Sequence, residues 1–242
     1  MAGPAVKVEA LTRHFGEVIA LNGVSLEIPI HTLYGIIGAD GAGKSTLFDI
    51  LATLLTPDTG RAVVLGLDAT LNPAALRSHI GFMPQKFSLY EDLSVKENLL
   101  FFADIFGVER HERDKRLKRL LEFSRLAPFQ ERRVRFLSGG MKQKLALSCA
   151  LIHTPELLIL DEPTTGVDPV SRKEFWDLLR ELKEGGMTLL VSTPYMEEAE
   201  YCDRLALLHQ GRVLMEGTPA GLLSAYPAAK RMQDLFFLAL SS

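Results

Sequence analysis

Short apolar runs alternate along this chain with segments in which apolar residues recur every three or four positions. The short runs predict buried strands and the second pattern predicts amphipathic helices. The predicted strands are Val24 to Ile28, Leu33 to Ile37, Ile80 to Phe82, Leu157 to Leu160, Thr188 to Val191 and Leu205 to Leu208. The predicted helices are Ser45 to Leu55, Val95 to Phe106, Asp114 to Phe123, Gly140 to Ile152 and Ser171 to Glu184. Strands that alternate with helices indicate an α/β fold, in which helices flank a parallel or mixed sheet.

One stretch departs from this alternation. Residues 93–154 contain helical patterns and no predicted strand. We interpret them as a helical subdomain inserted into a single domain of residues 1–242, because no linker of low complexity separates them from the rest. Near the end of the chain, Met232 to Leu240 has helical spacing and is too short to span a bilayer, so we expect it to pack on its own domain.

Composition narrows the class of protein. The 242 residues are 47% hydrophobic and 24% charged, which is typical of a soluble globular domain. The net charge of -3 makes nucleic acid an unexpected partner. No run of 18 apolar residues predicts a membrane span, and the first residues lack a secretory pattern. Cys149 and Cys202 have no metal-ligand spacing and are expected to be reduced thiols. We therefore expect a cytoplasmic protein.

The segment GADGAGKST, residues 38–46, carries the strongest chemical signal. Gly38, Gly43, Lys44 and Ser45 match the pattern G-x-x-x-x-G-K-[ST] between a predicted strand and a predicted helix. Glycines allow backbone N–H groups to approach phosphate oxygens, and the helix N-terminus adds partial positive charge. Lys44 is suited to the β- and γ-phosphates and the Ser45 hydroxyl to Mg²⁺. The segment predicts a nucleotide-binding phosphate loop.

A second signal is LLILDEP, residues 157–163, an apolar strand that ends in two carboxylates. Ligands of open α/β sheets bind at the carboxyl ends of the strands. Asp161 is suited to hold Mg²⁺, directly or through water, and Glu162 to deprotonate an attacking water. These assignments predict hydrolysis of the bound nucleotide.

A third signal is LSGG, residues 137–140, at the start of a predicted helix. Ser138 and Gly140 form a second anion-binding helix start, which one nucleotide on one protomer does not need. We infer that two protomers face each other and that each offers this turn to the γ-phosphate held by the other. The alternative is an ordinary helix that Ser138 caps.

With these three motifs in this order, the chain resembles ABC-type ATPases over nearly its whole length, from LTRHFG at residues 11–16 to GRVLMEGTP at residues 211–219. The resemblance implies a P-loop NTPase fold of ABC ATPase type with ATP and Mg²⁺ as ligands. The implied catalytic residues are Glu162 and Gln85, and the implied metal-binding residues are Ser45, Gln85 and Asp161. The implied nucleotide-binding residues are Phe15, Gly38, Asp40, Gly41, Gly43, Lys44, Ser45, Thr46, Ser138, Gly139, Gly140 and Asp168.

The resemblance also implies roles and partners. Phe15 would stack on adenine, Gln85 would sense Mg²⁺ and pass strain to a membrane partner, and Asp168 would organise the dimer seam. Alternatively, Phe15 is a core aromatic and Gln85 an exposed loop amide. The chain is most similar to exporter ATPases, including drug- and antibiotic-efflux subunits, that pair with separate multispanning permeases. It would act beside a second ABC ATPase domain, in a homodimer or a heterodimer, at the inner face of the membrane.

Three positions depart from the family pattern: Ala39 replaces a proline, Asp40 an asparagine and Pro194 a histidine. That histidine donates a hydrogen bond to the γ-phosphate, whereas proline has neither a side-chain donor nor a backbone N–H. Pro194 also suits the first turn of a helix begun by Glu197 and Glu198. We expect tight ATP binding and slow hydrolysis. Two functions stay open: an exporter ATPase, or an ATP-binding clamp whose LSGG turn completes the site of a different, histidine-bearing partner.

Overall fold

The computed structural model describes residues 3–86 and 89–241, with side chains as far as residue 239. Its strands are β1 (Val6–Phe15), β2 (Val18–Ile28), β3 (Leu33–Ile37), β4 (Thr59–Val64), β5 (Leu67–Asp68), β6 (Ile80–Met83), β7 (Leu157–Asp161), β8 (Thr188–Thr193), β9 (Arg204–His209) and β10 (Arg212–Gly217). Its α-helices are α1 (Lys44–Leu51), α2 (Pro73–Arg77), α3 (Val95–Ile105), α4 (Arg110–Phe123), α5 (Gly139–Leu151), α6 (Pro169–Glu184), α7 (Pro219–Ala225) and α8 (Met232–Ser241). Short 3-10 helices are η1 (Ala127–Phe129), η2 (Val134–Phe136) and η3 (Met196–Tyr201).

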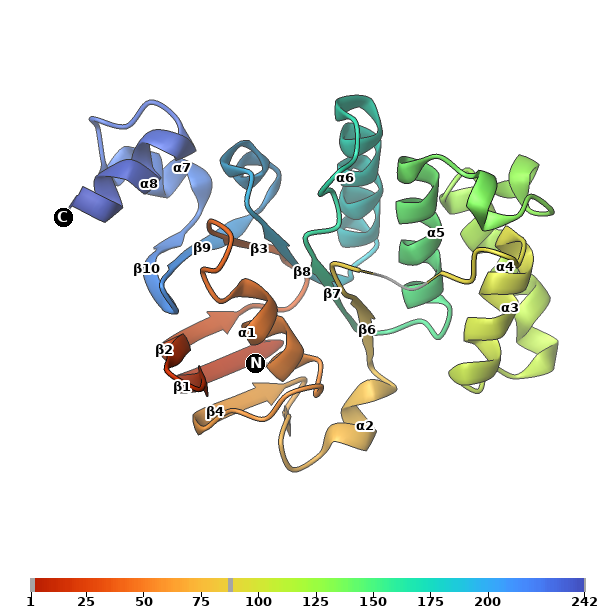
Figure 1. Cartoon of the computed structure of the whole chain (residues 1–242), viewed down its shortest axis with the longest axis horizontal. Coiled ribbons are helices and arrows are strands. Elements are labelled where there is room, and N and C mark those ends of the chain that lie inside the picture. The colour runs from red at the N-terminus through yellow and green to blue at the C-terminus, as the bar shows by residue number, and fades with distance from the viewer. Residues whose placement is uncertain (1–2, 87–88, 242) are drawn as a thin grey trace.

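The strands form two sheets (Figure 1). The larger sheet has the order β10-β9-β3-β8-β7-β6, with β9, β3, β8, β7 and β6 parallel and β10 antiparallel at one edge. This mixed sheet confirms the predicted fold class. The smaller sheet is antiparallel, with the order β2-β1-β4-β5. The predicted strand Val24 to Ile28 lies in this second sheet, whose existence the apolar pattern did not indicate.

Helices cover both faces of the larger sheet because its strands alternate their side chains. Leu157 and Ile159 of β7 pack with α1 and the antiparallel sheet, whereas Leu158 and Leu160 pack on the opposite face with α5 and α6. Trp176 of α6 is fully buried in that second layer. Strands that are apolar on both faces are typical of a parallel sheet between two layers.

Helices α3, α4 and α5 lie together at one end of the molecule (Figure 1). Their facing side chains form a separate apolar cluster that includes Leu99, Leu117, Leu121 and Leu145. Helix α5 also packs on the larger sheet through Leu147, so it joins the helical region to the α/β core. Within the described part of the chain, none of the helices combines the length and apolarity that crossing a bilayer requires.

Two details of the local predictions change, and a third is confirmed. The helix predicted to reach Leu55 ends at Leu51, and the N–H groups of residues 54 and 55 both bind the carbonyl oxygen of Asp49. The segment after Pro194 forms the 3-10 helix η3 instead of an α-helix, and Pro194 precedes it, so the prediction that Pro194 lies in a first helical turn is wrong. The predicted terminal helix is confirmed as α8, where Met232 and Leu235 are buried against the core.

Candidate active site

The functional motifs converge because three parallel strands end at one edge of the larger sheet. Ile37 of β3 lies beside Thr193 of β8, and Asp161 of β7 lies beside Ser192. The residues that follow these strands therefore emerge side by side. They are the loop at residues 38–43, the carboxylate Glu162 and Pro194.

The loop after β3 has a backbone that requires glycine. Gly43 has φ +104°, and a Cβ atom there would lie 2.3 Å from the carbonyl oxygen of Ala20. Among the described residues, no side chain caps the N-terminus of α1, so the first amides of that helix have no side-chain acceptor. A phosphate group suits this position because it supplies both the acceptors and the negative charge.

Lys44 is buried, with 3% of its surface exposed, among oxygen acceptors. Its Nζ donates to the carbonyl oxygens of Gly38 and Ala39 at 2.7 and 3.1 Å. The same Nζ lies 3.0 Å from Oε1 of Glu162, which is 6% exposed. The predicted phosphate-binding amine and the predicted general base therefore form an ion pair with each other.

Glu162 is held by further contacts. Its Oε2 accepts hydrogen bonds from Gln85 Nε2 at 2.9 Å and from Thr165 Oγ1 at 3.3 Å. Its backbone N–H donates to Ser192 Oγ at 2.9 Å, and its φ is +47°, in the left-handed region that side chains rarely adopt. Such strain is concentrated at functional sites. Gln85 is exposed in the loop after β6, as the loop-amide alternative expects, and its side-chain amide contacts Glu162 directly.

Asp161 is the second buried carboxylate, with 4% of its surface exposed. Burial raises the pKa of Asp161, and this rise is opposed by hydrogen bonds from the hydroxyls of Ser192 and Ser45 and by the charge of Lys44. No cluster of three or more His, Cys, Asp or Glu side chains suited to a metal occurs among the described residues. Mg²⁺ is commonly held by one or two protein ligands together with substrate phosphates, so Ser45 and Asp161 fit that ion.

The LSGG turn lies apart from the phosphate loop within one chain. Ser138 is exposed and caps α5, accepting a hydrogen bond from the N–H of Met141 at 3.3 Å. Gly140 is buried beneath α6, where a Cβ atom would lie 2.5 Å from Ser171. In the described part of the chain, no hydrogen bond or ion pair joins this turn to residues 38–46. Helix capping therefore accounts for Ser138 in the isolated protomer.

The remaining predicted residues lie at the surface. Phe15 is 48% exposed at the end of β1, with the guanidinium of Arg13 5.0 Å from its ring centre, so the core-aromatic alternative is wrong. Asp40 is exposed on the phosphate loop. Asp168 caps α6, accepting from the N–H groups of Val170 and Ser171, and hydrogen bonds from Ser171 lower its pKa.

The buried carboxylate of Glu198 is a polar group beside the site that the sequence pattern does not predict. The pattern indicates only an acidic helix start, yet this side chain is 1% exposed and accepts hydrogen bonds from Thr164 and Thr193. The sequence carries one weak signal for it: Thr164 and Thr193 each follow an apolar strand at the functional edge of the sheet. Nothing local pairs them with Glu198.

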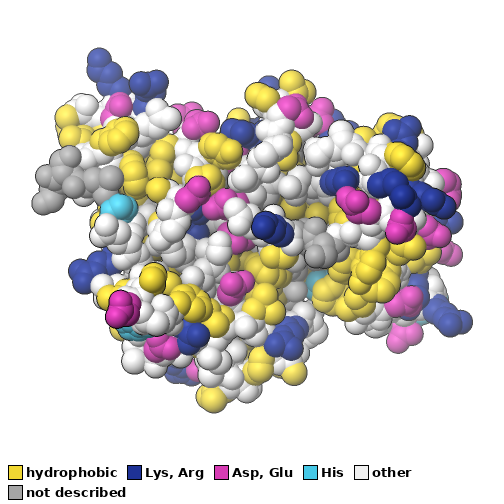
Figure 2. All heavy atoms as spheres, viewed as in Figure 1, with side chains coloured by type: hydrophobic (Ala, Val, Ile, Leu, Met, Phe, Trp, Pro, Cys, Tyr) yellow, Lys and Arg dark blue, Asp and Glu magenta, His cyan; other side chains and the backbone are white. Residues whose placement is uncertain are grey.

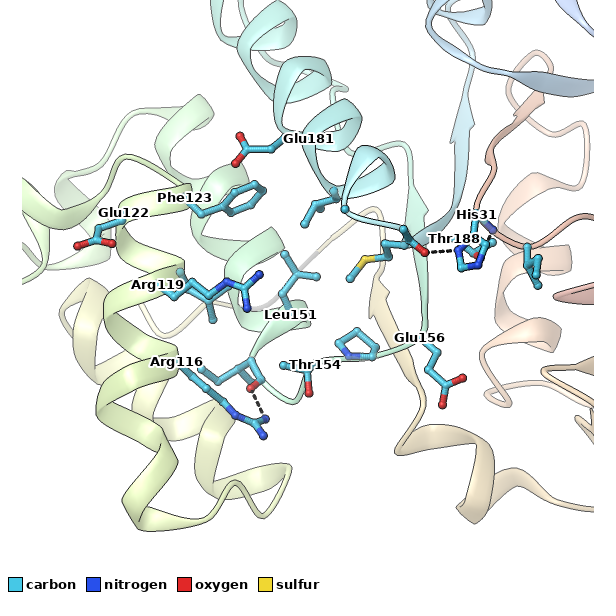
Figure 3. Close-up of a pocket in the computed structure, with 18 of the residues that line it drawn as sticks. His31, Arg116, Arg119, Glu122, Phe123, Leu151, Thr154, Glu156, Glu181 and Thr188 are labelled. Carbon is cyan, nitrogen blue, oxygen red and sulfur yellow. Dashed lines mark hydrogen bonds between the residues drawn. The ribbon is translucent and has the colours of Figure 1, made fainter.

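A large groove of about 980 Å³ lies away from these motifs. Arg116 and Arg119 of α4 extend toward it from one side, and Thr188 and His31 border the other (Figure 3). Thr188 begins β8 and Glu156 precedes β7, so the groove opens at the amino ends of the strands. It is therefore separate from the candidate active site at the carboxyl ends.

A family model described as ABC transporter matches residues 21–165. The chain belongs to this family. It is 47% identical over 220 residues to a probable multidrug ABC transporter ATP-binding protein, YbhF, of Escherichia coli, covering 85% of this chain and 38% of that protein. It is 42% identical over 219 residues to the daunorubicin resistance ATP-binding protein DrrA3 of Streptomyces coeruleorubidus, covering 90% of this chain and 69% of that protein.

Solved ABC cassettes share the fold. An ATP-binding subunit of an ABC transporter superposes with a TM-score of 0.86 at 28% identity, covering 98% of this chain and 99% of that one. An ATP-binding cassette in a dimeric post-hydrolysis state bound to ADP and Pi gives a TM-score of 0.78 at 30% identity, covering 88% of this chain and 98% of that one. This ABC chain is thus an ATP-binding domain of the ATPase class.

Proposed function

We propose that this chain binds and hydrolyses Mg-ATP to power an ABC exporter through ATP-driven dimerisation. The observation that carries the proposal is the convergence of Lys44, Asp161, Glu162 and Gln85 at one sheet edge, directly beside a glycine loop at an uncapped helix N-terminus. One relative is named as a probable multidrug ABC transporter protein and another for daunorubicin resistance, and both names support export as the direction.

We assign the roles that the family resemblance implies, and the contacts of Lys44, Asp161 and Glu162 support theirs. The amides of the phosphate loop and Lys44 bind the β- and γ-phosphates, and Phe15 stacks on the adenine. Ser45, Asp161 and Gln85 would hold Mg²⁺, which would neutralise charge on the phosphates when bound. Lys44 exchanges the carboxylate of Glu162 for phosphate oxygens, and Glu162 is thereby released to accept a proton from the attacking water.

The proposed partners follow from surfaces that one chain leaves open. Ser138 and Gly139 are exposed at the start of α5, where they can reach the nucleotide of a facing protomer, and Asp168 is exposed at the start of α6. Apolar side chains gather on the helical end of the molecule (Figure 2), where Tyr90 and Ile105 are 47% and 59% exposed. We assign this end, reached from the active site through Gln85, to a multispanning permease at the inner face of the membrane.

One observation favours a second function, a slowly hydrolysing clamp paired with a competent partner. Pro194 follows β8 at the active-site edge and offers no hydrogen-bond donor to a phosphate. Loss of one preorganised donor to a reacting oxyanion costs about 2.7 to 4 kcal/mol in the barrier. ATP binding would be spared, because Lys44 and the loop amides remain.

The test compares three purified chains. The parent should gain thermal stability with Mg-ATP and hydrolyse it. Glu162→Gln should bind ATP without turnover and accumulate as an ATP-dependent dimer in gel filtration, and Lys44→Ala should neither bind nor hydrolyse. Equal nucleotide protection of Lys44→Ala and the parent would refute the site. Binding without measurable turnover by the parent would favour the clamp.

A further inference from the structure

The carboxylate of Glu198 in η3 lies at the centre of a buried hydrogen-bond network that borders the predicted active site and uses none of the predicted site residues. Its Oε1 and Oε2 accept from Thr164 Oγ1 at 2.8 and 3.1 Å, and Oε2 also accepts from Thr193 Oγ1. Glu198, Thr164 and Thr193 are each 1% exposed. A buried carboxylate needs hydrogen-bond donors, and the hydroxyls of Thr164 and Thr193 supply them. Because both hydroxyls point their hydrogen atoms at Glu198, this carboxylate fixes their orientation.

Each hydroxyl belongs to a different segment of the active site. Thr193 ends β8 directly before Pro194. Its Oγ1 accepts from the N–H of Tyr195 at 3.1 Å, and its carbonyl oxygen accepts from the N–H of Gly38 at 3.2 Å. Glu198 is thus connected through Thr193 to Gly38, the first glycine of the phosphate loop.

The second branch reaches the general base. Thr164 lies two residues after Glu162, whose strained backbone needs a fixed chain on its C-terminal side. A third contact comes from α6: Nε of Arg172 lies 3.7 Å from Oε1 of Glu198, and its guanidinium stacks 4.1 Å from the ring centre of Tyr195. This helix begins at the cap residue Asp168.

From this geometry we propose that Glu198 is a positioning residue for ATP hydrolysis. It holds the Pro194 segment and the Glu162 segment at a set distance from the phosphate loop. Through Thr164, this network sets the alignment of Glu162 with the phosphates. The proposal rests on the proposed hydrolysis of ATP, but the network itself can be tested without turnover.

The main variant is Glu198→Gln, which removes the charge and one acceptor oxygen. The matched control is Glu197→Gln, an exposed neighbour on η3 whose carboxylate pairs with the same Arg172 at 3.7 Å. We expect Glu198→Gln to lower kcat about 10- to 100-fold, as loss of a supporting partner of an active-site ligand commonly does, with KM for ATP within about twofold. Glu197→Gln should retain the parent's kcat and KM.

Thr164→Val tests the branch to the general base and keeps the side-chain shape. It should lower kcat in the same direction, and the double variant Thr164→Val with Glu198→Gln should lose little more than the more impaired single variant. If Glu198→Gln does not fold, Thr164→Val with the Glu197→Gln control still decides the question.

Hydrogen–deuterium exchange gives a readout that does not require hydrolysis. In nucleotide-free protein, Glu198→Gln should speed amide exchange at least tenfold in three regions: the peptide that contains Gly38, the peptide that contains Tyr195 and the segment after Glu162. The control Glu197→Gln should leave the exchange rates of these three regions unchanged. Faster exchange confined to residues 196–201, or an unchanged kcat, would overturn the positioning role. A parent without ATPase activity would refute the proposed function, and the exchange experiment would then decide the network alone.

Discussion

The ion pair between Lys44 and Glu162 gives the most quantitative prediction. Both side chains are almost fully buried and their charged atoms lie 3.0 Å apart. At an effective dielectric constant of about 20, their attraction is about 5 to 6 kcal/mol. Desolvation offsets much of this, so the pair as a whole adds little to folding, whereas one charge left alone costs about 3 to 5 kcal/mol.

The perturbation is a double-mutant cycle of Lys44→Met and Glu162→Gln without nucleotide. Each single variant leaves a buried charged group without its partner, although Glu162 keeps its bonds from Gln85 and Thr165. We therefore expect a loss of about 3 kcal/mol for each single variant, the lower end of the range. The loss of the double variant should be clearly smaller than the sum of the two single losses, because neither Lys44 nor Glu162 is then left without its partner, although Asp161 still loses the attraction of Lys44.

The assay is thermal and urea unfolding of the four chains. At this chain length 1 kcal/mol shifts Tm by about 2 to 4 °C, so each single variant should melt about 6 to 12 °C below the parent. The control is Lys142→Met, which breaks an exposed pair with Glu91 of 2.7 Å and should cost about 1 kcal/mol or less. Additive losses in the double variant, or a loss for Lys44→Met no larger than for Lys142→Met, would refute the coupling.

Three further predictions test the site. Pro194→His should raise kcat by up to ~10²–10³-fold with little change in ATP affinity, and adding Glu162→Gln should abolish the gain. If a steady-state assay shows the same turnover with and without the histidine, the missing donor does not limit hydrolysis. Ser138→Arg should prevent ATP-dependent dimerisation in gel filtration, and mixing it with Lys44→Ala chains should restore one composite site per mixed dimer. The pKa of Asp168 is lowered in the folded protein from its ordinary value of 3.8, so its charge stabilises the fold above pH 3.8. This stabilisation is lost as the pH falls through the pKa of the folded state. The difference in Tm between the parent and Asp168→Asn should therefore narrow from pH 7 to pH 3.

Much of the fold and of the site was predictable because the signals are local. The loop from Gly38 to Ser45 needs glycines, a lysine and a serine at fixed positions between a strand and a helix. All of these residues lie within eight consecutive positions, so the pattern can be recognised from the sequence. Asp161 and Glu162 were predictable for the same reason, since they directly follow a run of four apolar residues, Leu157 to Leu160. Amphipathic periodicity likewise marked α3 and α6, because each buries one face, whereas α5 is buried on nearly all sides between the larger sheet and the other helices.

The tertiary structure alone decided which segments meet. An apolar pattern shows that β2 is buried on one side, but its pairing with β1 in a second sheet depends on long-range register. The contact of Lys44 with Glu162 and the bonds of Glu198 to Thr164 and Thr193 join distant segments, which only the side-by-side order of β3, β8 and β7 brings together. Local sequence determined the chemical groups of this ABC ATPase, and chain topology determined their partners, because burial is encoded by pattern whereas pairing depends on the packing of the whole fold.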